Sequence, residues 1–327
     1  MGDPVNSQLP GLTKAYLLGN SARALTPRES REWRPGDGVL WLHLDYTDPE
    51  MARWVREDSG VDAVVAEAIL APETRPRCLA HGDGLLLILR GVNQNPGADP
   101  EDMVSVRIWM AADRIISSGQ RKLLSIDDLS QEIEQGTGPV SQGEFLVRLG
   151  ELMADRIGDV VNDIDDVVDS LEDELLAVEH QELRYSLSNV RRQIVALRRY
   201  LAPQRDALAR LVTERSRLID DLVRMQLREL TDRMTRYIED LDEARDRASV
   251  THEELLNRLA ELTNRRMYLL TMVAAIFIPL SFITGLLGVN VGGIPGAHNR
   301  HAFLIVIGLL VIVCVAQWFY FRWRKWF

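Results

Sequence analysis

The sequence predicts an α+β membrane protein, in which an N-terminal α/β domain is followed by long helices and two C-terminal transmembrane helices. Short apolar strands alternate with helices in the first 140 residues. Helical periodicity then continues almost unbroken from residue 141, and two charge-free apolar runs end the chain. The 327 residues carry a net charge of -10, which argues against a nucleic-acid partner.

Residues 1–140 are expected to form a cytoplasmic α/β domain. The segments 39–45, 84–90, 104–110 and 114–118 are apolar and bounded by turn residues, which is typical of strands. Helices are predicted at 48–57 and 61–70, the first with Asp48 as N-cap and Pro49 at its first position. The Gly-Thr-Gly-Pro segment 136–139 is the expected domain boundary.

Residues 141–226 are expected to form long antiparallel cytoplasmic helices. Residues 151–182 contain twelve acidic residues and one arginine, Arg156. Residues 184–217 contain nine arginines and only two acidic residues, Asp206 and Glu214. This opposite charge predicts a helix pair linked by ion pairs between the two helices. Pro203 is expected to kink the second helix without ending it.

A third helix is predicted over 227–289, as a stalk that continues into the first membrane span. Without a helix breaker it would be ~95 Å long at ~1.5 Å per residue. A single apolar stripe on such a stalk cannot be buried by that helix alone, so we expect it to pack against copies of itself. The stripe consists of Leu227, Leu230, Met234, Ile238, Leu241, Leu255, Leu259 and Leu262.

Two apolar runs, 268–287 and 302–321, lack Asp, Glu, Lys and Arg. Each is long enough to span a bilayer core of ~30 Å, and runs of this length argue against a buried hairpin of a soluble protein. The external loop 290–301 is too short for a domain. The segments that flank the two runs are therefore expected on the same side of the membrane. Arginines before the first run and basic residues in the tail 322–327 place both termini in the cytoplasm.

One face of the first span combines small and hydroxyl residues with aliphatic ones. Its members recur at intervals of three and four, so they share one side of a helix. This face is a candidate pore lining, and close helix packing is the alternative, because small residues and Ser or Thr also favour helix contacts in membranes. The face consists of Met267, Thr271, Ala274, Ile278, Ser281 and Gly285.

The end of this span resembles a known family. Residues 276–285 read Ile-Phe-Ile-Pro-Leu-Ser-Phe-Ile-Thr-Gly, and Gly288, Val289 and Asn290 follow. With the Arg-Tyr-Leu-Ala-Pro-Gln-Arg-Asp stretch at 199–206, this pattern resembles the CorA superfamily of divalent cation channels, whose signature is Gly-x-Asn at the end of the first of two C-terminal spans. The loop at 291–296 and residues 89–102 resemble the ZntB zinc-transporter branch.

The resemblance implies a funnel-shaped homopentamer in the cell inner membrane, with a central pore lined by the first span. Gly288, Val289 and Asn290 are then expected at the pore entrance, where neutral oxygens can hold a hydrated cation. Zinc is the expected cargo, and no permanently bound cofactor is expected. Magnesium or cobalt is the alternative cargo, although the loop lacks the acidic residues that magnesium-type members tend to carry.

His298 and His301 in the loop are candidate zinc ligands, because zinc prefers nitrogen and sulfur donors. Exposed loop histidines without a special role are the alternative. The resemblance also implies inward transport coupled to a proton gradient, yet neither span holds a carboxylate or histidine. The acidic helix is a candidate cation reservoir near the pore mouth, or a set of solvated and paired charges.

The remaining function classes are an enzyme and a membrane-anchored scaffold or binding domain. Residues 1–140 show no phosphate-binding loop and no nucleophile elbow, which argues against an enzyme. A scaffold would need only the apolar hairpin and would not require the small and hydroxyl face that leads to Asn290. The expected partners are therefore further copies of the chain, membrane lipid and divalent metal ions.

Overall fold

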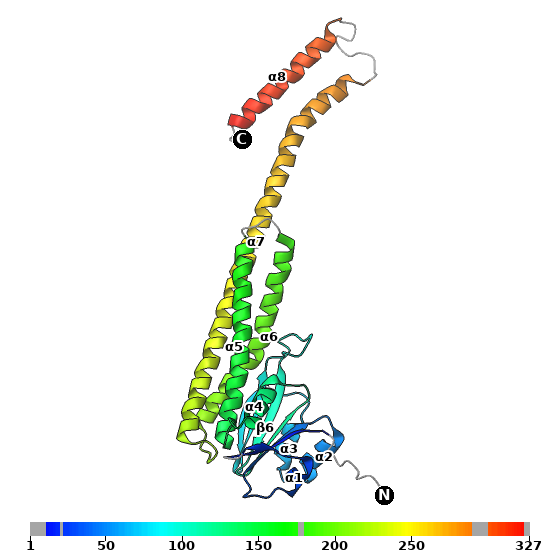
Figure 1. Cartoon of the computed structure of the whole chain (residues 1–327). Coiled ribbons are helices and arrows are strands. Elements are labelled where there is room, and N and C mark those ends of the chain that lie inside the picture. Colours follow the sequence, from blue (N-terminus) through cyan, green and yellow to red (C-terminus); the bar gives the residue numbers. More distant parts are fainter. Residues whose placement is uncertain (1–10, 20–21, 176–179, 290–299, 324–327) are drawn as a thin grey trace, which may run out of the picture. The chain divides into compact units, whose positions relative to one another are not determined.

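A computed structural model describes residues 11–19, 22–175, 180–289 and 300–323 (Figure 1). The chain divides into two compact units, residues 1–252 and 253–327, and each is described by itself. The elements in chain order are β1 (Leu12–Leu18), β2 (Arg23–Ala24), α1 (Pro27–Glu32), β3 (Val39–Asp45), α2 (Pro49–Glu57), α3 (Ala63–Leu70), β4 (Arg77–His81), β5 (Gly84–Gly91), β6 (Val104–Met110), β7 (Arg114–Gly119), α4 (Leu124–Glu134), α5 (Gln142–Glu174), α6 (His180–Thr213), α7 (Asp221–Leu287) and α8 (Ala302–Trp323).

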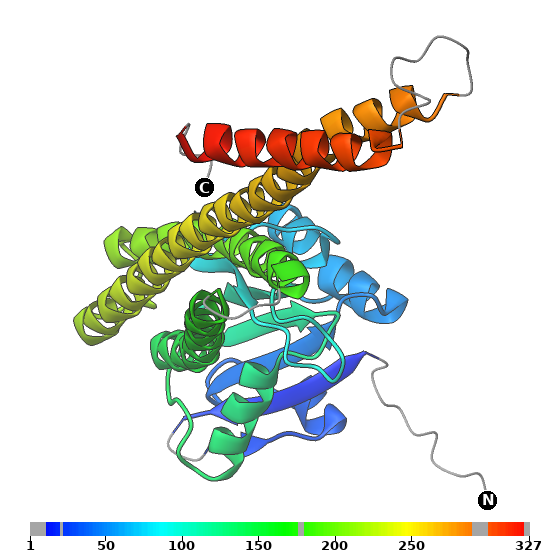
Figure 2. The same cartoon turned by 90° about the horizontal axis from the view of Figure 1, so that it is seen from above.

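A seven-stranded sheet in the order β2-β1-β3-β7-β6-β5-β4 is the centre of the first unit. Only β3 and β7 are parallel, and every other neighbouring pair is antiparallel. α3 contacts β6 and β7, whereas α6 contacts β4 and β5. Figure 2 shows α5, α6 and the first part of α7 gathered on one side of the sheet. The unit is therefore layered, as the alternation of strands and helices predicted.

Strand β3 shows how the sheet forms a core on both faces. Leu40, Leu42 and Leu44 join the apolar cluster of α2 and α3. The intervening Trp41 is fully buried on the opposite face, where its ring lies 4.8 Å from that of Phe145 in α5. Because side chains alternate along a strand, one segment thus supplies both layers.

The four strands predicted from the sequence are all present, with β5 and β7 one residue longer than expected. Helix α2 begins as predicted, because the Asp48 carboxylate accepts hydrogen bonds from the backbone N–H groups of Glu50 and Met51. The sequence reading missed β1, β2, β4, α1 and α4. Helix α4 has no side-chain hydrogen bond at its N-cap, so the usual start signal is absent there. Helix α1 does carry start signals, a capping box of Thr26 and Glu29 and Pro27 at its first position, but it is short and buries no residue.

Three long helices complete the first unit. α6 continues through Pro203, as expected. The predicted boundary at 136–139 lies within this unit, because α5 and α6 both contact β5 and so pack on the sheet domain. Glycines allow close approach of α5 to α7: a Cβ at Gly150 would lie 2.4 Å from the Leu230 side chain, and one at Gly158 would lie 2.6 Å from the Tyr237 hydroxyl.

The predicted ion pairs between α5 and α6 are not found among the described residues. Instead, the acidic α5 is paired with α7: Arg233 binds Asp155 at 2.6 Å, and Arg247 binds Asp165, Asp169 and Glu172. α5 and α6 contact each other, and each contributes buried apolar residues at helical spacing. The prediction was wrong because opposite net charge does not show which helix faces which.

The apolar stripe of the third helix is also buried differently from the prediction. Leu227, Leu230, Met234, Ile238 and Leu241 are at most 5% exposed within a single chain. The glycines of the neighbouring α5 let that helix approach the stripe closely. Copies of α7 are therefore not needed to cover it. Self-association therefore cannot be inferred from this part of the stalk.

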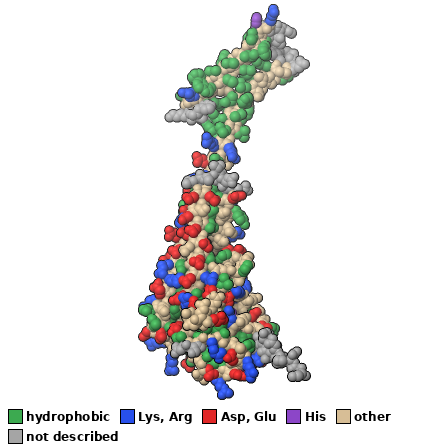
Figure 3. Space-filling model, in the orientation of Figure 1, with side chains coloured by type: hydrophobic (Ala, Val, Ile, Leu, Met, Phe, Trp, Pro, Cys, Tyr) green, Lys and Arg blue, Asp and Glu red, His purple; other side chains and the backbone are tan. Residues whose placement is uncertain are grey.

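The second unit contains the end of α7 and all of α8. Among the described residues, these two helices are long and apolar enough to cross a membrane, and almost none of their most apolar stretches is buried in the chain. Figure 3 shows hydrophobic side chains gathered over them. A helix of a soluble core would bury such a surface, so the observation favours insertion into lipid.

Candidate functional site

The small and hydroxyl face of the first span is exposed in the single chain. Met267 is 61% exposed and Ile278 is 66% exposed, and Thr271, Ser281 and Gly285 are exposed as well. Ala274 is half-buried. All six candidate pore-lining residues lie in α7, which is continuous from Asp221 to Leu287 and includes Pro279.

Helix α8 covers a different face of α7. The Gln317 side-chain amide donates a hydrogen bond of 3.5 Å to the Ala275 carbonyl oxygen. Met272 on this part of α7 is only 7% exposed, and Ala275, Ile276, Pro279 and Ile283 are half-buried. At ~100° per residue, this covered face is centred roughly 140° around the helix from the candidate pore-lining face. The small and hydroxyl face is therefore not the surface that packs on α8.

The two threonine hydroxyl groups of this span are bonded to the helix itself. Thr271 Oγ1 donates to the Met267 carbonyl oxygen at 2.8 Å, and Thr284 Oγ1 donates to that of Leu280 at 3.0 Å. Such bonds satisfy a hydroxyl donor inside a membrane without a polar partner. The case for a pore face therefore depends on its exposure and its small residues more than on its hydroxyl groups.

The end of the first span leads directly to the predicted entrance. α7 ends at Leu287, and the Gly288 N–H donates to the carbonyl oxygens of Thr284 and Gly285 at 2.9 and 3.2 Å. A Cβ at Gly288 would lie 3.1 Å from the Thr284 carbonyl oxygen, so glycine allows a tight helix end. Val289 is 47% exposed. Asn290, the third residue of the motif, lies outside the described residues.

Of the two loop histidines, His298 lies outside the described residues and His301 is exposed just before α8. The His301 carbonyl oxygen accepts the Ile305 N–H at 3.1 Å, which begins the helical bonding of α8. Within the part of the chain that the structure describes, no three His, Cys, Asp or Glu side chains are grouped as a metal site. A zinc site at His301 would thus need donors from the remaining loop residues or from another copy of the chain.

The acidic helix carries two different sets of carboxylates. Asp165, Asp169 and Glu172 surround the Arg247 guanidinium. The hydrogen bonds that Arg247 donates, first to Glu172 and then to Asp169, raise its pKa above the ordinary value. This cluster is structural, because its charge is already neutralised in part by Arg247. The predicted cation reservoir can therefore include only the remaining carboxylates of α5.

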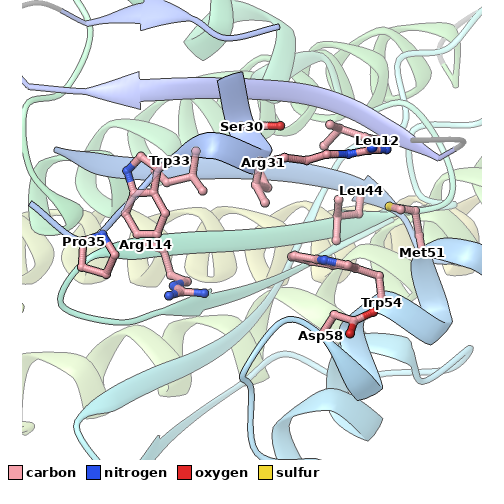
Figure 4. A pocket seen from close by; sticks show the side chains of 12 residues that line it. Leu12, Ser30, Arg31, Trp33, Pro35, Leu44, Met51, Trp54, Asp58 and Arg114 are labelled. Atoms are coloured by element: carbon pink, nitrogen blue, oxygen red, sulfur yellow. The ribbon is translucent and has the colours of Figure 1, made fainter. Parts of the chain in front are cut away.

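The sheet domain contains a cavity that the sequence did not predict (Figure 4). It has a volume of about 310 Å³. Leu40, Leu42 and Leu44 of β3 contribute apolar side chains, and Trp33 and Trp54 also line the cavity, together with Arg31, Arg114, Asp58, Ser30, Leu12, Pro35 and Met51. The Arg114 guanidinium lies 5.2 Å from the Trp33 ring centre and donates to the Ser59 carbonyl oxygen. None of the predicted site residues lies in this cavity.

His43 is a second polar group that sequence reasoning missed. Its Nδ1 lies 2.8 Å from the Ser117 hydroxyl, on neighbouring strands β3 and β7. Burial, assisted by the charge of Lys14, lowers the pKa of His43 from 6.5 to about 4. No local signal marks this residue, because the sequence does not show that its ring lies beside Ser117 of the neighbouring strand.

Comparisons with known proteins show similarity over most of the chain. The family model described as CorA-like Mg2+ transporter protein matches residues 36–324. The divalent cation transporter CmaX of Pseudomonas aeruginosa is 40% identical over 299 residues, covering 88% of this chain and 87% of the relative. The zinc transport protein ZntB of Yersinia enterocolitica is 36% identical over 286 residues, with the same coverage of both chains.

Solved structures show the same fold over nearly the whole chain. The full-length CmaX protein has a TM-score of 0.86 at 38% identity, covering 98% of this chain and 100% of that one. The CorA magnesium transporter from Methanocaldococcus jannaschii has a TM-score of 0.81 at 20% identity and covers 96% of this chain and 99% of that one, a likeness of fold alone. With two apolar C-terminal helices and a family match over most of its length, the chain belongs to the CorA-like family of membrane transporters.

Proposed function

We propose that this protein transports divalent metal cations across the inner membrane as a homopentamer, with the small and hydroxyl face of α7 lining a central pore. The observation that carries the proposal is the exposure of this face on the side of α7 that α8 leaves uncovered. In a bilayer, such a face would meet either lipid or another copy of the chain. Small residues favour the second, because they let helices approach closely.

Zinc is the proposed main cargo. Relatives named zinc transport protein ZntB match 88% to 98% of the chain, and the loop from Gly288 to His301 contains histidines but no Asp or Glu. Imidazole nitrogen suits zinc, whereas magnesium is usually bound through carboxylates and water. The CmaX relative is named only as a divalent cation transporter, so magnesium or cobalt transport is the competing assignment.

The Gly288-Val289-Asn290 motif is the proposed entrance. Copies of Asn290 around a pore axis would present neutral amide oxygens to a hydrated cation. We expect Asn290→Ala to abolish metal uptake while the oligomer remains intact, as judged by native mass spectrometry. Normal uptake by this variant would remove the motif from the entrance. Val311→Ala in α8 is the control, because it truncates an exposed side chain of the second span outside the motif.

Proton coupling is a separate part of the proposal. Carboxylate and histidine side chains are the usual proton carriers within membranes, and both spans lack them. A coupled proton would therefore pass through water, the loop histidines or the cytoplasmic units. Double substitution of His298 and His301 by Gln tests the loop route, because it removes both imidazoles and keeps hydrogen-bonding side chains.

The experiment that tests the function uses purified protein in liposomes that contain a zinc-sensitive or magnesium-sensitive dye. Entry of each metal is measured with and without an inward proton gradient. Zinc entry that the gradient accelerates, and that excess magnesium inhibits weakly, supports the zinc assignment with coupling. Magnesium entry that is indifferent to pH would move the protein to the magnesium channels. No flux of either metal from intact oligomers would leave only a membrane-anchored scaffold.

A further inference from the structure

We propose that the outward face of α6 in one copy of the chain docks on the outward face of α5 in the next copy. This inference rests on the homo-oligomer proposed above and assigns its cytoplasmic contact. Two surfaces carry it. The acidic stripe is Asp159, Asp163, Asp166 and Asp173 of α5, and the basic stripe is Arg184, Arg191, Arg192 and Arg199 of α6.

The acidic stripe is exposed and makes no ion pair with the described residues. The α5 carboxylates that pair with α7 are a different set, which consists of Asp155, Asp165, Asp169 and Glu172. At ~100° per residue, the acidic stripe is roughly opposite the apolar side of α5 that contains Val161 and Ile164. The stripe therefore faces away from the apolar contacts that α5 makes within its own chain.

The basic stripe is likewise exposed and without an ion pair among the described residues. Two other α6 arginines are paired, Arg198 with Asp242 at 2.9 Å and Arg205 with the adjacent Asp206 at 2.7 Å. Within the stripe, Arg192 donates only to the Asn189 side-chain oxygen, and Arg199 lies 5.5 Å from the Tyr200 ring centre. Four positive charges thus lack a carboxylate within the described chain.

Both stripes also contain exposed apolar side chains. Tyr185 and Val195 beside the basic stripe are 71% and 60% exposed, and Val167 beside the acidic stripe is 43% exposed. A groove of about 430 Å³ lies at the Arg199 end of the basic stripe, lined by Ile194, Val195, Arg198, Arg199, Ala202, Pro203 and Arg245. These features give a docking partner apolar contact area in addition to charge.

The occupant is a second copy of this chain because the two stripes are complementary to each other. They lie at different places on one protomer, four negative charges on α5 and four positive charges on α6, so each copy can offer one stripe to each of two neighbours. Contacts of this heterologous kind generate a ring when the rotation closes. Exposed ion pairs add little affinity, but opposed like charges are costly, so the stripes would mainly fix the partner and its register.

The test uses full-length chains with reversed stripes. The acid-reversed chain carries Asp159→Lys, Asp163→Lys and Asp166→Lys, and the base-reversed chain carries Arg191→Glu, Arg192→Glu and Arg199→Glu. Each is produced with two different affinity tags, alone and in combination, and mixed oligomers are captured from detergent in low salt. A swapped chain that carries both sets of changes shows whether the pairing is restored, and its thermal unfolding shows that the chain folds.

We expect the acid-reversed chain to be captured with the base-reversed chain ~10-fold or more in excess of capture with itself. The swapped chain should assemble with itself as the unmodified chain does. Raised salt should reduce the preference, because these charges are exposed. Arg53→Glu with Glu57→Lys on the exposed side of α2 is the control, and it should show no preference for any partner.

Random capture among all reversed chains, with oligomers intact, would overturn this assignment and leave the proposed transport untouched. Retention of the unmodified chain on vesicles of anionic lipid through the basic stripe, without any partner preference, would also overturn it. Failure of the unmodified chain to assemble at all would instead refute the homo-oligomer, and with it the proposed central pore.

Discussion

The two parts of helix α7 differ in how far their apolar side chains are buried, although the helix is continuous from Asp221 to Leu287. In the first unit, its apolar stripe is buried by other helices of the same chain: Leu227 and Leu241 have no exposed surface. In the second unit, Met267 and Ile278 are more than half exposed. One chain therefore provides all the partners that the first part of the helix needs, but not those of the second part.

This difference shows where an oligomer would supply contacts that the single chain lacks. Burial of apolar surface stabilises the first unit without further copies, so the first unit gives no apolar reason for oligomerisation. The second unit exposes a face of α7 that α8 does not cover. The small residues of this face favour another helix as its neighbour, because they let two helices approach closely.

Substitution in the buried apolar stripe of α7 should destabilise the protein most. Leu230→Asp places a carboxylate where the side chain is 3% exposed and contacts the Gly150 position of α5. Loss of packing together with burial of a charge should lower the free energy of unfolding by at least ~4 kcal/mol. Thermal unfolding of the purified protein measures the loss.

Met225→Asp is the matched control, because Met225 lies on the same helix and is 61% exposed. Its effect on the free energy of unfolding should stay within ~0.5 kcal/mol. Equal effects of the two substitutions would show that the stripe is not buried against α5 in the protein.

The stability of the first unit should also depend on pH, through His43. Burial lowers the pKa of His43 from 6.5 to about 4, so the folded first unit resists protonation that the unfolded chain accepts. Stability due to the neutral form is present above pH 6.5 and is lost as the pH falls toward 4. Because His43 is half-buried, we expect a loss of about 2 kcal/mol over this range.

Hydrogen exchange of the β3 and β7 amides at several pH values measures the His43 effect. The apolar runs of the two spans contain no group that titrates between pH 4 and 6.5, so exchange in the spans should not follow this curve. His43→Gln should remove most of the acid sensitivity of β3. An unchanged pH dependence in this variant would contradict the assignment.

The smallest expected effect concerns the ion pairs between α5 and α7. Arg247→Gln leaves Asp165, Asp169 and Glu172 without their common cation. Because these groups are partly exposed, the loss should be about 1 kcal/mol, and high salt should reduce it. Arg228→Gln on the same helix, where the structure records no ion pair among the described residues, should leave stability and its salt dependence unchanged.

The sequence allowed much of this fold to be predicted, because its signals are local. Short apolar segments bounded by turn residues located β3, β5, β6 and β7, and Asp48 with Pro49 located the start of α2. The short edge strands and α4 carry weaker signals. The partner of each long helix could not be predicted, because charge composition does not determine which faces meet, and only the structure shows Arg247 against α5.

The candidate site could be predicted in part for the same reason. Spacing alone placed Met267 and Ile278 on one face, since helical periodicity is a local property. The position of α8 on the opposite side depends on packing between segments 42 residues apart, as in the Gln317 contact with Ala275, so no sequence pattern showed it. Asn290 and His298 remain predictions, because they lie outside the described residues.

Thiol labelling of two neighbouring residues of the first span, in liposomes, tests most directly whether this face of α7 lines a pore. Ser281→Cys and Phe282→Cys are made in a Cys314→Ala background, because Ser281 lies on the proposed pore face and Phe282 lies beside it at 69% exposure. A charged, membrane-impermeant thiol reagent reacts only where water reaches the cysteine. If this face of α7 lines the pore, the reagent should block metal flux through Ser281→Cys and leave Phe282→Cys unaffected. Equal labelling, or no reaction at Ser281→Cys while flux continues, would contradict a pore lined by this face of α7.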